Sequence, residues 1–264
     1  MQMNAAQLVP YLGRLDDIPG GLERWDAELM VHLSEAQHGR SVRGDLLEIG
    51  TWLGRTSVLL GFLAGGGEQL QVCDLFDRVP PTEAGRQALI ESGDGTVTLA
   101  DFQASYGRFH STMPVIHQCP SGELSVTNVG RSFRFVHVDG SHLYEAVLED
   151  MALAHSILKK GGIVVFDDIA NLGHLGVPAA VWSGVRATGF VPFACTPTKL
   201  YATLDEDDAS AYATVVADAA REACHEVREN VVAGAKIVGT WSKAPTLQQR
   251  VVRKALRTVR LPRR

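Results

Sequence analysis

The sequence predicts an α/β protein built on a doubly wound parallel sheet. Short apolar runs recur along the first two thirds of the chain, and segments long enough for a helix separate them. Strands that alternate with helices return to one sheet through right-handed crossovers, which leaves helices on both faces. The strands expected in this sheet are residues 45–49, 69–74, 114–117, 133–138 and 163–166.

Helices are expected before the first strand and between the strands. Leu22, Trp25, Leu29 and Leu33 recur at helical spacing and predict an amphipathic helix over residues 22–37. The other expected helices are residues 55–64, 99–109, 142–158, 178–187 and 206–230, and two closing strands are expected at residues 190–195 and 199–204.

These elements divide the chain into three parts. Residues 1–40 are predicted to form an N-terminal helical segment or lid, residues 41–204 the main domain, and residues 205–264 C-terminal helices with a basic tail. Residues 250–264 carry seven basic side chains and no acidic one, whereas the rest of the chain has 18 basic and 30 acidic residues. Because the body lacks a basic majority, we expect no nucleic-acid binding.

The basic tail fits an amphipathic helix with three alternative roles: packing on a partner subunit, weak contact with an anionic surface, or solvation of the chain end.

The composition is that of a globular protein, with 45% hydrophobic and 21% charged residues in a chain of 264. No apolar run approaches the roughly 20 residues that span a bilayer, and the first ten residues lack the pattern of a signal peptide. The four cysteines are widely separated without a CxxC pair, which argues against zinc and redox motifs and for reduced thiols. We therefore expect a cytoplasmic protein.

A glycine-containing turn follows the first predicted strand. Glu48, Gly50 and Gly54 form an E-x-G-x-x-x-G pattern between this strand and a helix that begins near Arg55. Glycine allows a tight turn and close approach of a ligand, and a helix N-terminus offers free N–H groups to an anionic group. The pattern differs from the G-x-G-x-x-G of dinucleotide enzymes. The alternative is a strand–helix turn without a ligand.

Asp74 ends the second predicted strand, about 20 residues past the glycines. An acid at this place in such folds accepts hydrogen bonds from the hydroxyls of a ribose. In isolation, an aspartate that caps its own loop is an equal alternative. Together with the glycine turn, Asp74 favours ribose binding.

Three carboxylates follow two apolar strands, with Asp139 after one and Asp167 and Asp168 after the other. Because the carboxyl ends of parallel strands meet at one edge, we expect these side chains to lie together there. Clustered carboxylates repel one another unless a cation neutralises them, and oxygen ligands favour Mg²⁺, with Mn²⁺ or Ca²⁺ as alternatives. The competing interpretation is that one acid caps a helix and another pairs with an arginine.

Two histidines are candidates for a general base. His142 lies three residues past Asp139, and His174 lies in the loop after Asp168. Histidine changes charge near neutral pH and can accept the proton of a hydroxyl. The alternative for each is a solvated loop histidine.

In combination, these motifs resemble those of class I S-adenosylmethionine-dependent O-methyltransferases. The group with the greatest resemblance is that of the macrocin- and aminocoumarin-type sugar O-methyltransferases, which are methyltransferase family 24-like. The resemblance covers roughly residues 18–204 and rests on Glu48-x-Gly50-x-x-x-Gly54-x-x-Ser57, Asp74, Asp139-Gly140-Ser141-His142-x-Tyr144 and Asp167-Asp168. It implies a Rossmann-like class I methyltransferase sheet, a homodimer or higher homo-oligomer, and a small-molecule or oligosaccharide acceptor.

The resemblance also implies roles for individual residues. The turn from Gly50 through Thr51 to Gly54 would hold the methionine part of S-adenosylmethionine, and Glu48 would brace it. The remaining residues implied in cofactor binding are Ser57, Asp74 at the ribose, Ser121 near the adenine, and Asp139. The implied ligands of Mg²⁺ are Asp139, Asp167 and Asp168.

The chain departs from the pattern of this group at the general base. Some members carry a second acid where this chain has Ser141, and others carry a histidine where it has Ile169 and Ala170. The base is therefore left open between His142, His174 and a metal-bound carboxylate, with Asp139 included in the catalytic set.

The motifs together with this resemblance predict a Mg²⁺-dependent O-methyltransferase, and the resemblance alone implies that its acceptor is a hydroxyl of a sugar or glycoside. The enzymatic alternatives are a metal-independent or catechol-type O-methyltransferase and a nicotinamide dehydrogenase, the last disfavoured by the missing G-x-G-x-x-G. A non-catalytic S-adenosylmethionine-binding interaction protein is the alternative outside enzymes.

Overall fold

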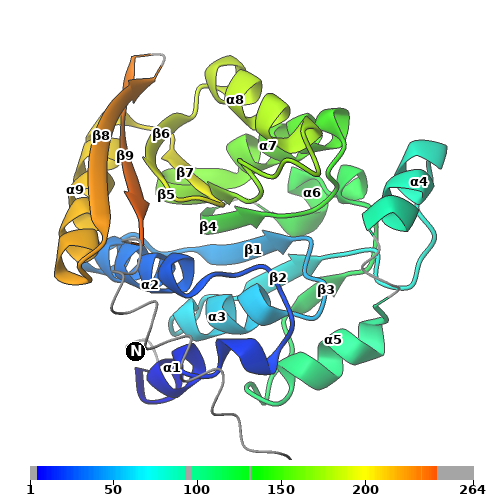
Figure 1. The fold of residues 1–264 in the computed structure, drawn as a ribbon. Coiled ribbons are helices and arrows are strands. Elements are labelled where there is room, and N and C mark those ends of the chain that lie inside the picture. Colours follow the sequence, from blue (N-terminus) through cyan, green and yellow to red (C-terminus); the bar gives the residue numbers. More distant parts are fainter. Residues whose placement is uncertain (1–4, 93–96, 131, 233, 243–264) are drawn as a thin grey trace, which may run out of the picture.

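The computed structural model describes residues 5–92, 97–130, 132–232 and 234–242. These residues form one nine-stranded sheet in the order β3-β2-β1-β4-β5-β7-β6-β9-β8 (Figure 1). The strands are β1 (Asp45–Ile49), β2 (Leu70–Cys73), β3 (Val115–His117), β4 (Phe133–Val138), β5 (Leu158–Phe166), β6 (Val191–Cys195), β7 (Leu200–Thr203), β8 (Glu226–Val232) and β9 (Ala235–Trp241).

The strands β3, β2, β1, β4 and β5 are parallel, as the sequence predicts. The chain moves outward from β1 to β2 and β3, and then crosses to the other side of β1 to form β4. This reversal of strand order creates a switch point between β1 and β4, and ligands of such sheets bind at the carboxyl ends of the strands there.

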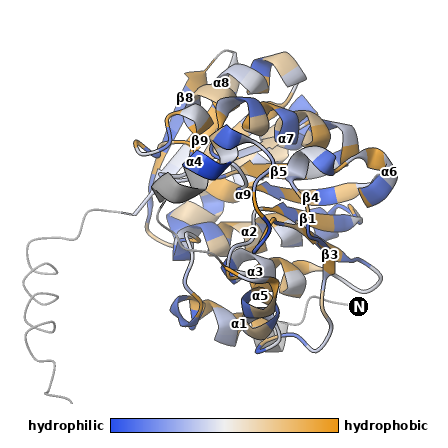
Figure 2. Cartoon of the chain, turned by 90° about the vertical axis from the view of Figure 1, so that its right-hand side faces the viewer, coloured by the Kyte–Doolittle hydropathy of each residue, from blue (hydrophilic) through white to orange (hydrophobic). Residues whose placement is uncertain are grey.

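Helices cover both faces of the sheet (Figure 1). They are α1 (Ala5–Leu12), α2 (Arg24–Gly39), α3 (Arg55–Leu63), α4 (Glu83–Ser92), α5 (Leu99–Tyr106), α6 (Val126–Val129), α7 (Tyr144–Ile157), α8 (Gly176–Thr188) and α9 (Glu206–Glu222), with short 3-10 turns η1 (Leu15–Asp17) and η2 (Ser121–Glu123). Successive strand side chains alternate between two cores, so that Leu46 packs with α2, α3 and α9 while Leu47 packs with α7 and α8. In Figure 2 hydrophilic and hydrophobic segments alternate along α7 and α8, as expected for helices with one side on the sheet.

The C-terminal region differs from the prediction. A helix was expected over residues 206–230, but α9 ends at Glu222, and β8 and β9 form an antiparallel hairpin that extends the sheet. The β8 sequence, EVRENVV, has no two-residue period and is exposed along most of its length, so its strand conformation comes from pairing with β9. The part of residues 205–264 that the structure describes is therefore not purely helical, and the predicted basic tail at residues 250–264 lies outside the described residues.

The N-terminal segment contains α1, η1 and α2, and α2 packs against α9. The helices α1 and α4 were not expected from the sequence. Among the residues that the structure describes, no helix combines the length and apolar composition that a membrane-crossing segment requires.

Candidate active site

The turn after β1 has the strand–turn–helix form that its glycines predict. Gly50 has φ +81°, and a Cβ atom there would lie 1.9 Å from the backbone oxygen of Asp139. Gly54 also has positive φ and immediately precedes α3. Only glycine fits at position 50, because the turn after β1 is in contact with the end of β4.

Glu48 lies behind this turn in a buried polar chain. The Ser57 hydroxyl donates a hydrogen bond to Glu48 Oε2, and His137 Nδ1 lies 3.2 Å from Glu48 Oε1. All three side chains are buried. Glu48 therefore joins α3 to β4, and Ser57 faces the interior, behind the turn on which cofactor contacts were expected.

Asp74 is engaged with the same turn. Its Oδ2 accepts hydrogen bonds from the backbone N–H groups of Thr51 (2.7 Å) and Trp52 (3.0 Å), and its Oδ1 accepts one from Phe76 N (2.8 Å). This is the loop-capping arrangement that the sequence left open as an alternative. A carboxylate has further lone pairs, so ribose binding by Asp74 stays a prediction.

Ser121 lies in η2, the short turn that packs against α7 beside the carboxyl ends of β2 and β3. It is half-buried there and close to the buried side chain of Asp150. Its expected position near an adenine is untested, because no ligand contact defines that position.

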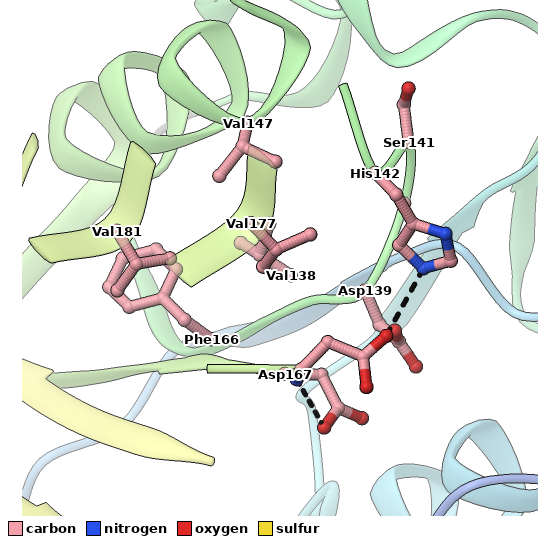
Figure 3. Close-up of a pocket in the computed structure, with 11 residues that line it drawn as sticks. Val138, Asp139, Ser141, His142, Val147, Phe166, Asp167, Val177 and Val181 are labelled. Carbon is pink, nitrogen blue, oxygen red and sulfur yellow. Dashed lines mark hydrogen bonds and ion pairs between the residues drawn. The ribbon is translucent and has the colours of Figure 1, made fainter. Parts of the chain in front are cut away.

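The three predicted carboxylates do meet at the carboxyl edge of β4 and β5, in a narrow pocket (Figure 3). The apolar wall of this pocket consists of Val138, Val147, Phe166, Val177 and Val181. The carboxylates do not form a single cluster. Asp139 belongs to one group with His137 and Asp167, and to a second group with His142 and Asp168. Within each group, the candidate ligand atoms lie within 4.8 Å of one another.

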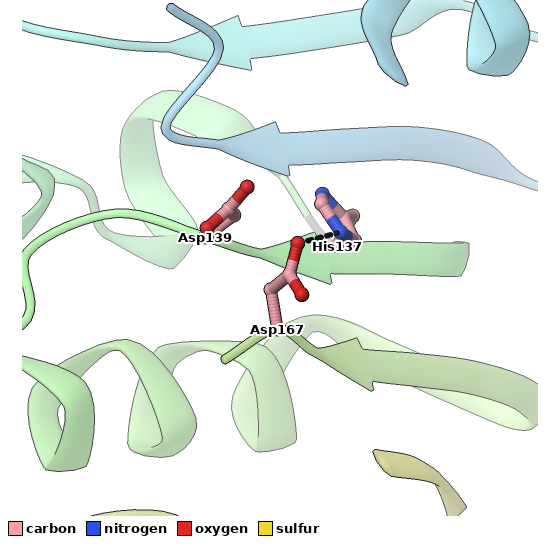
Figure 4. A group of neighbouring side chains, drawn as sticks. All are labelled: His137, Asp139 and Asp167. Atoms are coloured by element: carbon pink, nitrogen blue, oxygen red, sulfur yellow. Dashed lines mark ion pairs between the residues drawn. The ribbon is translucent and has the colours of Figure 1, made fainter. Parts of the chain in front are cut away.

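Asp167 points into the protein toward two buried nitrogen-bearing side chains. Lys199 Nζ donates a hydrogen bond to Asp167 Oδ2, and His137 Nε2 lies 3.8 Å from the same oxygen (Figure 4). Burial alone would raise the pKa of the Asp167 carboxyl, but the positive charge of Lys199 holds this pKa below its usual value. Burial would likewise lower the pKa of Lys199, and the attraction of Asp167 and Asp139 holds it above its usual value.

Asp168 points to the opposite side, toward His142. Asp168 has φ +59°, an uncommon conformation for a non-glycine residue, which separates its side chain from that of Asp167. His142 Nε2 lies 3.3 Å from Asp168 Oδ2, and the rings of His142 and His174 stack with centroids 4.0 Å apart. The hydrogen bond from His142 lowers the pKa of Asp168 against the opposing effect of burial.

Asp139 lies between the two groups. Burial and the neighbouring negative charge of Asp167 raise the pKa of Asp139 well above its usual value. The edge thus offers a carboxylate–imidazole pair for proton transfer and carboxylate oxygens for a cation.

Lys199 and His137 are residues of this edge that sequence reasoning missed. A lone lysine beside an otherwise apolar strand was the available signal for Lys199.

Comparisons with known proteins agree with this fold. Residues 47–169 match the family model of a methyltransferase domain. The structure of the O-methyltransferase NovP has 16% sequence identity and a TM-score of 0.54, with 67% of this chain and 79% of that chain covered. An O-methyltransferase from Bacillus cereus in complex with SAH has 12% identity, covers 76% of this chain and 91% of its own, and gives a TM-score of 0.48. CalS11, a TDP-rhamnose 3'-O-methyltransferase, has 16% identity, covers 76% and 94%, and gives a TM-score of 0.45.

No curated protein matches the chain by sequence. The likeness to NovP shows a shared fold, and the family match runs independently from within β1 to just past the end of β5. The chain therefore has a Rossmann-like α/β fold like that of NovP, and its residues 47–169 match the model of a methyltransferase domain.

Proposed function

We propose that the chain is an S-adenosylmethionine-dependent O-methyltransferase that acts on a hydroxyl of a small-molecule acceptor. The observation that carries the proposal is the contact between the turn after β1 and the end of β4. A Cβ atom on Gly50 would lie 1.9 Å from the Asp139 backbone oxygen, so the expected cofactor turn adjoins the edge that carries His142 and Asp168.

The cofactor would bind along the turn from Gly50 to Gly54. The N-terminus of α3 offers N–H groups to the carboxylate of its methionine part. Asp74 fixes the shape of the turn through Thr51 and Trp52, so it positions the cofactor even where it does not touch the ribose. S-adenosylmethionine supplies a methyl group on a positively charged sulfur.

His142 is the proposed general base. Its Nε2 faces Asp168, and its other ring nitrogen points away from that contact (Figure 3). Asp168 can hold the ring in one orientation and stabilise the protonated form. The acceptor oxygen forms a bond to the methyl carbon as the carbon–sulfur bond breaks, S-adenosylhomocysteine leaves, and the hydroxyl proton moves to His142. His174, stacked on His142, limits the motion of the ring.

A divalent cation fits part of this edge. Asp139 and Asp168 would hold the expected Mg²⁺, because each offers a carboxylate oxygen within the same group. Such an ion would bind the acceptor hydroxyl and lower its pKa. Asp167, the third expected ligand, is engaged by Lys199. This ion pair favours the alternative of metal-independent transfer, and EDTA treatment of the active enzyme distinguishes the two.

The sugar or glycoside acceptor rests on the sequence resemblance and is part of the proposal. The acceptor panel should therefore contain glycosides, nucleotide sugars and catechols. The assay follows transfer of labelled methyl from S-adenosylmethionine. Methylated product from any of these hydroxyl compounds supports the proposal, and methylation confined to nitrogen or carbon acceptors would contradict it.

The variant His142→Ala tests the assigned base. Loss of a general base lowers the rate by about 10²- to 10⁴-fold, while affinity for S-adenosylhomocysteine should stay within about threefold. His155→Ala is the matched control, since His155 is an exposed histidine in the last turn of α7, the helix that begins two residues after His142. Equal rates for both variants would remove His142 from the mechanism.

A further inference from the structure

Lys199 is a fully buried lysine at the start of the antiparallel part of the sheet. Phe166 pairs with Leu200 across β5 and β7, so the next residues beyond this pair, Asp167 and Lys199, lie opposite each other. The Lys199 side chain has 0% exposure and its ammonium donates to Asp167 Oδ2. A buried ammonium needs a negative partner, and here the partner belongs to the expected cation site.

The position of Lys199 is fixed by its own turn. Thr196 N donates to Lys199 O (2.9 Å), and Lys199 N donates to Thr196 Oγ1 (3.0 Å). Asp26 of α2 anchors this turn, because it accepts hydrogen bonds from Thr196 (2.8 Å) and Thr198 (2.9 Å). Asp26 is thus already satisfied, and the ammonium is directed to Asp167.

Both oxygens of Asp167 are in use. Oδ1 accepts a hydrogen bond from Asp168 N (2.8 Å), and Oδ2 accepts the one from Lys199. His137 lies on the inner side of the same carboxylate. A divalent cation could use Asp167 only by displacing one of these donors.

We propose that Lys199 is a built-in counter-ion that removes Asp167 from the divalent-cation site of this edge. The three carboxylates Asp139, Asp167 and Asp168 carry up to three negative charges, and Lys199 cancels one of them. Only Asp139 and Asp168 are left for an added cation, which lowers both the number of ligands and the attraction for it. Lys199 is a positioning residue, since it acts through Asp167. The inference refines the acceptor side of the proposed function and rests on it for the reaction.

Binding of Mn²⁺ alone, followed by the loss of the free-ion EPR signal, tests this without cofactor or acceptor. The variants are Lys199→Met, which keeps most of the side-chain volume without the charge, and the double variant Lys199→Met/Asp167→Asn. Lys199→Met should bind Mn²⁺ at least tenfold more tightly than the native protein, because it frees a third carboxylate. The double variant should return to within about threefold of native affinity.

Two results would overturn the proposal. Lys199→Met that binds Mn²⁺ no more tightly than the native protein would show that the lysine does not restrain the site. A double variant as tight as Lys199→Met would show that Asp167 is not the released ligand. If Lys199→Met fails to fold, Lys199→Leu takes its place, because it also removes the charge, and both expectations apply to it unchanged. Failure here leaves S-adenosylhomocysteine binding unaffected, so it is distinct from failure of the proposed function.

Discussion

Two fully buried cations, Arg134 and Lys199, lie at opposite ends of the parallel strands and differ in how their charges are paired. Arg134, near the start of β4, donates to Glu68, Ser34, Gln37 and the Leu63 backbone oxygen. The Lys199 ammonium, at the carboxyl edge, donates to Asp167 beside two further carboxylates. The first site is an ion pair saturated with hydrogen bonds, whereas the second leaves negative charge unmatched. This difference separates a buried charge that stabilises the fold from one that belongs to a reaction site.

The largest effect on stability is expected for Arg134→Met. Removing one partner of a buried ion pair costs about 3–5 kcal/mol, because Glu68 is left without its partner. Burial opposes the charged form of Glu68, but its hydrogen bonds with Arg134 lower its pKa to about 2. Native stability should therefore fall as the pH drops from about 4.5 toward about 2, and this loss should shrink in the variant.

Urea unfolding from pH 2 to 7 measures both effects. Arg221→Met is the control, because its ion pair with Asp218 is exposed and such pairs contribute about 0–1 kcal/mol. A variant of Arg134 that unfolds like the control would mean that the two buried cations do not differ as described.

Asp150 on α7 extends the comparison to a buried acid without a cation. Both of its oxygens lie away from water, and within the described residues no charged side chain forms an ion pair with them. Burial raises its pKa from 3.8 to about 7, against a smaller opposing effect of the Ser121 hydroxyl. The folded state therefore holds a proton that the unfolded state releases between these values, and stability should decrease as the pH rises from about 4 to about 7.

Asp150→Asn should abolish this pH dependence, since the amide does not titrate. A shift of about three pKa units corresponds to up to about 4 kcal/mol between the two ends of the range. The difference between native and variant unfolding free energies, measured at pH 4, 5.5 and 7.5, isolates this group. A difference that is constant with pH would show that Asp150 titrates normally.

Asp168→Asn tests whether a carboxylate of the carboxyl edge serves the proposed reaction rather than the stability of the fold. The variant keeps the shape of the side chain but removes the charge that orients and stabilises protonated His142, so the methyl-transfer rate should fall by about 10²-fold. Stability should change by less than about 1 kcal/mol, because Asp168 is half-buried and lies at the end of β5. Glu145→Gln, at an exposed position in the first turn of α7, is the control. A loss of stability larger than the loss of activity would make Asp168 a structural residue like Arg134.

The parallel half of the sheet was predictable because each strand is an apolar run that ends in a turn residue or an acid. The same rule correctly brought Asp139, Asp167 and Asp168 to one edge, and it placed His142 beside them. The splitting of the acids into two groups depends on Lys199, which approaches through an antiparallel strand. Strand order in that half follows from packing between distant segments, such as the anchoring of Thr196 by Asp26, and no local pattern specifies it.

The C-terminal region shows the same limit. Residues 226–232 show no regular alternation, and they form a strand because β9 pairs beside them. Likewise, the sequence favoured ribose binding for Asp74, and the capping contacts of this carboxylate were not predictable because they depend on where Thr51 and Trp52 direct their N–H groups.

The most direct test of the central claim is calorimetric titration of S-adenosylhomocysteine into the native protein freed of metal. We expect saturable binding at one site per chain, in the micromolar range or tighter, which weakens at least tenfold in Gly50→Ala because a Cβ atom there meets Asp139. Gly67→Ala, also at positive φ but with open space around it, should bind as the native protein does. No heat of binding to the folded native protein would contradict the assignment of a methyltransferase cofactor site to this edge.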